Sequence, residues 1–373
     1  MKVLYDNFIF QNQTIGGISR CCHELMKSLY DEKILDFYFP IYYSLNRYIQ
    51  NAQYTPKMNF YMNSFLCKIG EFRKYLRRKN TTSVIKALKT GKYDIFHPTY
   101  FSDYFIETLD AQAKTKLVIT IHDMVTEAYS EIFKDDPLKI PQIKRLLAHR
   151  ADKIITISEF SKSEILKYYP DIKESKIQVI YHGSPLENVV YEEKNKDNFI
   201  LHVGTRSFYK NFNKMLIAIA PILKDKNIKL VCASNWDFDE IEQNLISKLD
   251  INDYVISKKP SDKELFELYA KAKCCVFPSL YEGFGMPIIE AFASNCPVVC
   301  ANNASLPEVG SDACVYFDGN DEKSIYEAVK TVLENDSLQK DMIEKGLHRL
   351  KDFNWHKTAL QHKKVYEELI NNG

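Results

Sequence analysis

Short apolar stretches that alternate with helical patterns constrain the fold of this chain more than any other feature. In the first half, the strand-like stretches are Lys2–Asn7, Phe37–Tyr43, Asp94–His97, Leu117–His122, Ile154–Ile157 and Ile177–Ile180. In the second half, they are Phe199–Val203, Lys229–Ala233, Val255–Ser257, Cys274–Phe277, Pro297–Ala301 and Ala313–Phe317. Helical patterns lie between them, for example at Ser19–Leu29, Ser83–Lys89, Pro137–His149 and Ser161–Tyr168. This alternation predicts an α/β protein with parallel sheets covered by helices on both faces.

The length of the chain indicates more than one domain, because 373 residues exceed what one ordinary core accommodates. The charged run Tyr191–Asn198 separates the two alternating halves and is typical of a linker. We therefore expect an N-terminal domain over residues 1–190 and a C-terminal domain over residues 196–352. Ligands of parallel sheets bind at the carboxyl ends of the strands, so we expect a cleft where two such domains face each other.

Charge and composition exclude several classes of protein. Lys and Arg total 50 against 49 Asp and Glu, so a general affinity for nucleic acid is not indicated. No apolar run approaches the ~18 residues of a membrane-spanning helix, and the start of the chain is typical of a strand rather than a signal peptide. The nine cysteines are an odd number, several of them in apolar strand surroundings, and they suit buried thiols in a reducing cytoplasm.

The most informative motif is the stretch from Phe277 to Glu290. An apolar strand leads into a turn with Gly283 and Gly285, and a helix begins at Met286, followed by a proline suited to a first helical turn. Free backbone amides and the positive end of a helix dipole bind anions, most often phosphate. The flanking acids Glu282 and Glu290 suit hydroxyl groups, so a diphosphate with a sugar at each end fits the stretch. The alternative is a strand–turn–helix unit with surface acids.

This stretch resembles the Glu-x7-Glu element of glycosyltransferase family 4, whose members are retaining, nucleotide-sugar-dependent enzymes. The resemblance implies the GT-B fold, in which two Rossmann-like parallel-sheet domains face a central cleft. It also implies that a final helix, about His356–Asn371, crosses back, so that residues 353–373 complete the N-terminal domain. Carried over by position, Glu282 contacts the donor sugar and Glu290 contacts the ribose. The donor phosphate is then bound by the loop of Gly283, Phe284, Gly285 and Met286.

A second loop with cations follows the strand that ends at Val203. Arg206 and Lys210 can both reach a diphosphate and neutralise it as it leaves, and the family places phosphate-binding cations here. The alternative is a pair of surface cations, although positive charge opposes the dipole at a helix start. By analogy, the donor-binding set also includes Gly204, Asn211 and, beside the base, Lys258. The run Gly-x-Arg-x-x-x-Lys-Asn is similar to that of mannosyltransferase-like members, which makes GDP-mannose the first donor to test.

In the first half, Gly16 and Gly17 leave amides open at the start of a helix, which suits a phosphate or the acceptor. His122 and Asp123 end a strong strand. In the family, a histidine at this point contacts the transferred sugar, so the resemblance makes His122 a catalytic candidate. Asp123 either binds the donor or caps the next turn.

The resemblance implies transfer of a hexose from a nucleoside-diphosphate sugar to an acceptor hydroxyl with retained anomeric configuration. We expect no metal or other cofactor, because the Asp-x-Asp run at Asp237–Asp239 stands at a helix start and suits a cap. Two alternatives stay open: a nucleotide-sugar epimerase of the same fold, and a non-catalytic sugar-nucleotide-binding protein.

The stretch from Phe65 to Lys79 bears on the acceptor. Phe65, Ile69, Phe72 and Leu76 have helical spacing, and the cations around them outnumber a single acid, Glu71. A basic amphipathic helix of this kind can bind an anionic membrane surface. It can equally be a core-facing helix with a solvated basic side. Membrane binding would suit a lipid-linked saccharide acceptor, cell-envelope polysaccharide synthesis, and a peripheral location at the inner face of the cytoplasmic membrane.

Overall fold

The computed structural model describes residues 1–63, 65–111, 114–134, 136, 139–184 and 196–371. The chain forms two compact units, which we describe separately. Unit 1 comprises Met1–Gly183 with Trp355–Gly373, and unit 2 comprises Ser184–Asn354. Most of the predicted linker, at 191–195, lies outside the described residues, as do 185–190 and 372–373.

Unit 1 is built on a six-stranded sheet in the order β2-β1-β3-β4-β5-β6, and every strand pair is parallel. The strands are β1 (Val3–Tyr5), β2 (Phe37–Tyr38), β3 (Ile95–His97), β4 (Lys116–Ile121), β5 (Lys153–Thr156) and β6 (Ile177–Val179). Each falls within or close to a predicted stretch. β2 is shorter than predicted because Pro40 has no N–H to continue the hydrogen-bond ladder.

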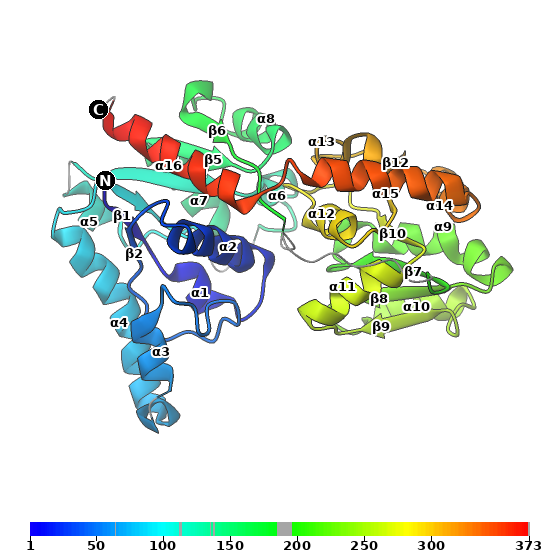
Figure 1. Ribbon diagram of the computed structural model, residues 1–373, viewed down its shortest axis with the longest axis horizontal. Helices are drawn as coiled ribbons and strands as arrows, with labels where there is room; N and C mark the ends of the chain where they lie inside the picture. Colours follow the sequence, from blue (N-terminus) through cyan, green and yellow to red (C-terminus); the bar gives the residue numbers. More distant parts are fainter. Residues whose placement is uncertain (64, 112–113, 135, 137–138, 185–195, 372–373) are drawn as a thin grey trace. The chain divides into compact units, whose positions relative to one another are not determined.

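Helices cover both faces of this sheet (Figure 1). They are α1 (Phe8–Asn12), α2 (Gly17–Asp31), α3 (Pro56–Met62), η1 (Phe65–Lys68), α4 (Gly70–Lys89), α5 (Ile106–Asp110), α6 (Val125–Ala128), α7 (Ile140–Arg150), α8 (Glu159–Tyr168), η2 (Glu174–Lys176) and α16 (Trp355–Asn371). Apolar side chains from β4 and β5 pack with those of α4, α7 and α8 into one core, which includes Ile119, Leu147 and Ile165. Residues 137–138 of the predicted helix Pro137–His149 lie outside the described residues.

The C-terminal helix α16 belongs to unit 1 and packs beside α2, as the resemblance to the GT-B fold implied (Figure 1). The hydroxyl groups of Tyr5 in β1 and Tyr366 in α16 are hydrogen-bonded at 2.7 Å. The Nδ1 atom of His97 in β3 lies 2.6 Å from the same Tyr366 hydroxyl. Buried polar contacts therefore fix α16 over the sheet.

The prediction of one amphipathic helix over residues 65–79 is wrong. The segment begins as a 3-10 turn, is extended at Ile69 (φ −84°, ψ 123°), and becomes helical only from Gly70. Leu76 is fully buried, but Phe65 is 73% exposed and Ile69 is 48% exposed. The glycine weakens the helix at this point, so the apolar side chains do not share one buried face.

Unit 2 has a second six-stranded sheet of parallel pairs in the order β12-β11-β10-β7-β8-β9. The strands are β7 (Phe199–Val203), β8 (Lys229–Ala233), β9 (Val255–Lys258), β10 (Cys274–Phe277), β11 (Val298–Ala301) and β12 (Cys314–Phe317). The helices are η3 (Phe208–Lys210), α9 (Phe212–Asp225), α10 (Glu240–Lys248), α11 (Asp262–Lys271), α12 (Met286–Ala293), α13 (Leu306–Gly310), η4 (Ser311–Ala313), α14 (Glu322–Leu333) and α15 (Asp336–Leu350). These two parallel sheets with helical layers confirm the predicted α/β class.

In each unit the strand order changes direction at one place. In unit 2 this place lies between β7 and β10, and in unit 1 it lies between β1 and β3. Loops that leave the carboxyl ends of strands at such a point diverge and leave room for a ligand. The loops after β7 and β10 carry the predicted donor residues. No helix in the described ranges is both long and apolar enough to cross a membrane.

Candidate functional site

The loops after β7 and β10 meet through an ion pair between two predicted site residues. The Nζ atom of Lys210 lies 2.6 Å from Oε1 of Glu282, and both side chains are largely buried. The backbone supports the pair, because the amide of Leu280 donates to the carbonyl of Tyr209 at 2.8 Å. A cation and a carboxylate therefore lie side by side at the change in strand order of unit 2.

The helix α12 begins at Met286, four residues after Glu282, and has an uncapped start. Its N-cap is Gly285 at φ 113°, and no side chain caps it. A residue with a side chain would be strained at this φ, and its Cβ would lie 3.1 Å from Leu306 Cδ2. Phe284 is buried with its ring against Phe353 at 5.7 Å between centroids, which holds the turn in place. The result is a fixed helix N-terminus suited to an anion.

Ser305 holds this turn from a neighbouring loop, and sequence reasoning missed it. Its hydroxyl lies 2.9 Å from the carbonyl of Glu282 and 2.8 Å from the carbonyl of Phe284. A serine well separated in sequence from the motif gives no local signal, although it precedes Leu306-Pro307 at a helix start. Ser305 therefore fixes the backbone on both sides of Gly283.

Replacing Ser305 by Ala should lower kcat/KM for the donor about fivefold, because a buried hydroxyl whose hydrogen bonding to two loop carbonyls contributes ~1 kcal/mol is lost. Ser294→Ala is the matched control. Both serines are fully buried in unit 2, but the Ser294 hydroxyl has no hydrogen-bond partner among the described residues. Steady-state kinetics should separate the two variants, and equal values of kcat/KM would show that Ser305 does not support the loop.

Glu290 lies one turn into α12 and is buried. Its Oε2 atom accepts a hydrogen bond from the Tyr269 hydroxyl at 3.2 Å. Burial and the nearby carboxylate raise the pKa of Tyr269 well above its usual value, so the hydroxyl keeps its proton. Tyr269 thus orients Glu290, and the assignment of Glu290 to the ribose stays a prediction.

The structure does not place the Arg206 guanidinium with Lys210 and Glu282. Its Nε donates to Glu242 Oε1 at 2.8 Å in a buried ion pair, and its Nη2 donates to the carbonyl of Asp237 at 2.6 Å. The ring of Phe238 lies 4.8 Å from the guanidinium carbon. In this arrangement Arg206 holds the start of α10, while its Nη1 atom is buried without a hydrogen-bond partner among the described residues.

The other predicted donor residues of unit 2 surround the same strand ends. Gly204 has φ 120°, which disfavours a side chain, and Asn211 has φ 57° with its Nδ2 donating to the Gly319 carbonyl at 2.7 Å. Lys258 ends β9 with an exposed side chain. Asp239 caps α10 by accepting a hydrogen bond from the amide of Glu242. This is the helix cap predicted from the sequence for the Asp237–Asp239 run.

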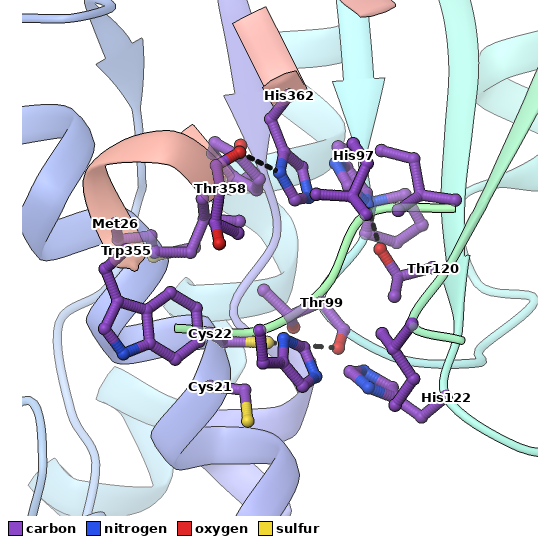
Figure 2. A pocket seen from close by; sticks show the side chains of 17 residues that line it. Cys21, Cys22, Met26, His97, Thr99, Thr120, His122, Trp355, Thr358 and His362 are labelled. Carbon is purple, nitrogen blue, oxygen red and sulfur yellow. Dashed lines mark hydrogen bonds between the residues drawn. The ribbon is translucent and has the colours of Figure 1, made fainter. Parts of the chain in front are cut away.

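In unit 1, His122 lies at the carboxyl end of β4 beside a small cavity of about 30 Å³ (Figure 2). Rings from other elements line the same cavity, among them His97, His182, His362 and Trp355. The His122 ring lies 5.6 Å from that of His182, which in turn lies 5.5 Å from Trp355 in α16. Sequence reasoning singled out His122 but not the group of histidines around it, which only the sheet topology brings together.

The environment of His122 keeps its ring neutral. Burial lowers the pKa of His122 to about 4, the Asp123 carboxylate opposes this shift, and the Lys144 ammonium adds to it. Asp123 caps the next turn, because its Oδ1 accepts from the amide of Val125 at 3.1 Å. The capping alternative therefore describes Asp123 in this structure, and its contact with the donor stays a prediction.

The start of α2 is partly closed by a side chain. Oε1 of Gln13 accepts from the amide of Ser19 at 3.3 Å, and a Cβ added at Gly16 would lie 2.4 Å from the same oxygen. Around Gly17 there is open space. An anion at Gly16 and Gly17 would therefore share this helix start with Gln13, which the predicted Gly-Gly loop did not include.

Comparison with known proteins gives two family models that match successive parts of the chain. The family model described as Glycosyltransferase Family 4 matches residues 15–188, and that described as Glycosyl transferases group 1 matches residues 185–349. The chain is 29% identical over 303 residues to O-antigen chain mannosyltransferase B of Escherichia coli, covering 76% of each protein. It is 31% identical over 215 residues to O-antigen chain mannosyltransferase RfbU of Salmonella typhimurium, covering 57% of this chain and 60% of that protein.

Solved structures show the same fold. The sucrose-phosphate synthase of Thermosynechococcus elongatus superposes with a TM-score of 0.73 at 18% identity, covering 100% of this chain and 99% of that one. Anabaena HepE, in complex with UDP and glucose, gives a TM-score of 0.70 at 14% identity, covering 99% and 100%. Together with the matched families, these findings establish that the chain is a glycosyltransferase of family 4 with the GT-B fold.

Proposed function

We propose that this enzyme transfers a hexose from a nucleoside-diphosphate sugar to a hydroxyl of a saccharide or lipid-linked saccharide, with retained anomeric configuration. The observation that carries the proposal is the Lys210–Glu282 ion pair beside the uncapped start of α12. A diphosphate is the ligand that satisfies both an ammonium group and a helix N-terminus. Glu282 would then exchange its partner Lys210 for a hydroxyl of the donor sugar.

The chemistry follows from where charge develops. Breaking the bond between sugar and phosphate moves negative charge onto the departing diphosphate, which Lys210 and the α12 amides would stabilise. The leaving phosphate takes the proton of the acceptor hydroxyl on the same face of the sugar. We propose that this needs no metal, and that His122, as a neutral ring, contacts the transferred sugar.

For the donor, we propose GDP-mannose. Two relatives similar to this chain are named as O-antigen mannosyltransferases, which supports mannose and envelope polysaccharide synthesis. A donor at 100 times its Kd should stabilise the fold by ~2.7 kcal/mol. Thermal unfolding with GDP-mannose, UDP-glucose and the free diphosphates therefore tests the donor, and protection by UDP-glucose alone would contradict mannose.

The function is tested by following purified enzyme with donor and a mannose-containing acceptor. Retention predicts an α-linked product from an α-linked donor, read by the anomeric proton signal, with turnover unchanged after chelation of metals. A new nucleotide sugar formed from donor alone would instead identify an epimerase. No turnover in the presence of tight donor binding would identify a binding protein.

We further propose that the enzyme binds an anionic membrane surface through a basic tip formed by α3, η1 and the start of α4. In Figure 1 these elements extend away from the sheet of unit 1. Phe60, Phe65, Ile69 and Tyr75 are exposed there. The cations of the tip are Lys57, Lys68, Arg73, Lys74, Arg77, Arg78 and Lys79. Exposed rings among cations suit the headgroup region of an anionic bilayer.

The double variant Phe60→Ser/Phe65→Ser should lose at least tenfold in affinity for vesicles of phosphatidylglycerol and phosphatidylcholine, because two exposed rings no longer enter the bilayer. Ile132→Ser is the control, since Ile132 is exposed in unit 1 outside the tip. Sedimentation with the vesicles measures the change. Equal binding by wild type to neutral and anionic vesicles, or no binding to either, would contradict the proposal.

A further inference from the structure

Three consecutive backbone carbonyls around His122 each accept a hydrogen bond from a side chain of a different element. The pairs are Thr156 Oγ1 to the carbonyl of Ile121 at 3.0 Å, Ser161 Oγ to the carbonyl of His122 at 3.3 Å, and Lys144 Nζ to the carbonyl of Asp123 at 3.1 Å. The donors come from β5, α8 and α7, respectively. The end of β4 is thus held from three directions at successive residues.

These donors are inaccessible to water, with 0% of Thr156 exposed and 1% each of Ser161 and Lys144. A buried donor or acceptor that loses its partner costs ~1–3 kcal/mol, because water does not replace the bond. Any rotation of the backbone at residues 121–123 breaks at least one of these bonds. The backbone that carries the His122 ring therefore has one strongly preferred position.

Lys144 is the strongest member because its ammonium group is fully used. Besides Asp123, its Nζ donates to Thr126 Oγ1 at 2.8 Å and to Glu127 Oε2 at 2.7 Å, which accounts for its three N–H bonds. The other oxygen of Glu127 accepts from the Tyr169 hydroxyl at 2.6 Å. The positive charge is paired and the group is hydrogen-bonded, as a buried lysine requires.

The imidazole of His122 depends on this backbone for its orientation. Among the described residues its ring nitrogens make no hydrogen bond, and its ring contact is with His182. A histidine that is not anchored through its own nitrogens can be aimed only by its backbone and by packing. A small rotation of a group near a reacting centre can lower the reaction rate strongly.

We propose that Thr156, Ser161 and Lys144 act as a carbonyl clamp, a set of positioning residues that aims His122 at the transferred sugar. The inference rests on the proposed function, in which His122 contacts that sugar. The clamp residues themselves touch no substrate. Replacing a clamp residue should therefore change kcat rather than donor affinity. The change should arise only because the orientation of His122 is altered.

Ser161→Ala is the lead variant, since it removes a hydroxyl without leaving a charge. We expect kcat to fall about tenfold with the KM for donor changed less than twofold, and Ser161→Thr, which keeps the hydroxyl, to restore most of the rate. The decisive measurement is a double-mutant cycle with His122→Ala. In that background Ser161→Ala should change kcat by less than twofold, because the residue through which it acts is gone.

The same cycle with Lys144→Met extends the test, with urea unfolding of each variant to confirm folding. Lys144→Met leaves Glu127 without its buried counter-ion, so if that variant does not fold, Thr156→Val takes its place, because it removes only a hydroxyl. Multiplicative losses in the cycle would overturn the clamp while leaving glycosyl transfer intact. Full activity of His122→Ala would overturn both the clamp and the role of His122, whereas a wild type without donor turnover would overturn the proposed function.

Discussion

Lys210→Met is expected to lower kcat by about 10²- to 10³-fold, the size of effect seen when one preorganised hydrogen-bond donor to a developing anion is removed. The Nζ atom lies 2.6 Å from Glu282 and at the loop that leads to α12, where the diphosphate would depart. Methionine keeps most of the length of the side chain but leaves the leaving group without its cation. Because the interaction strengthens as charge develops, the loss should fall mainly on kcat.

Lys214→Met is the matched control, because Lys214 lies on α9 and its Nζ donates to the Asn320 carbonyl at 3.0 Å. It should keep wild-type kcat. Rapid-quench measurement of donor consumption would separate chemistry from product release in both variants. If Lys210→Met and Lys214→Met behaved alike, the cation at the leaving group would have to be another residue, and the proposed mechanism would be wrong.

The sequence predicts the two sheets well because their signal is local. An apolar stretch followed by a helical pattern records burial on both faces of a parallel sheet, and β7, β8 and β10 lie where the pattern places them. The pattern fails at residues 65–79, where spacing alone suggests one helix. Whether Ile69 and Gly70 continue a helix depends on what packs against them, and that information is not local.

In the candidate site, too, the features that are local in sequence can be predicted, and the contacts between distant residues cannot. Gly283, Gly285 and Glu282 are close in sequence, so their turn and helix start can be predicted from the chain. Ser305, the partner of that turn, and Glu242, the partner of Arg206, are far from the residues they hold. Arg206 shows the consequence, since its position in the motif predicts phosphate contact while tertiary structure pairs it in the interior. Contacts between residues that are far apart in the sequence produce no periodic pattern, so they can be identified only from a three-dimensional structure.

Mild acid is expected to destabilise unit 1 strongly, because buried neutral histidines gather around the cavity beneath α16. Burial lowers the pKa of His122 and His362 to about 4, and it lowers the pKa of His97 and His182 well below their usual value. In the unfolded chain each would titrate near its ordinary pKa of ~6.5. The unfolded state therefore binds more protons than the folded state between these values.

This difference in bound protons determines in which direction the free energy of unfolding changes with pH. The stability that these histidines contribute is fully present above pH ~6.5 and is lost as the pH falls toward ~4. Each one contributes a slope of about 1.4 kcal/mol per pH unit once its unfolded form is protonated. Among the described residues of unit 2, His202 is the one histidine of this kind, and burial lowers its pKa to about 4. Unit 1 should therefore lose stability more steeply than unit 2.

Trp355 provides a specific probe, because it is buried in α16 beside His182, and the chain has 2 tryptophans in all. In a Trp236→Phe variant, urea unfolding followed by Trp355 fluorescence should show a free energy of unfolding that falls from pH 7 to 5.5. Ordinary carboxylates titrate below this window, so histidine dominates it. His362→Leu should reduce the slope of the free energy of unfolding against pH by about the contribution of one histidine. This reduction should appear whatever the variant does to the free energy of unfolding at pH 7. A Trp355 unfolding transition that does not move between pH 7 and 5.5 would mean that the buried histidines do not control the stability of unit 1.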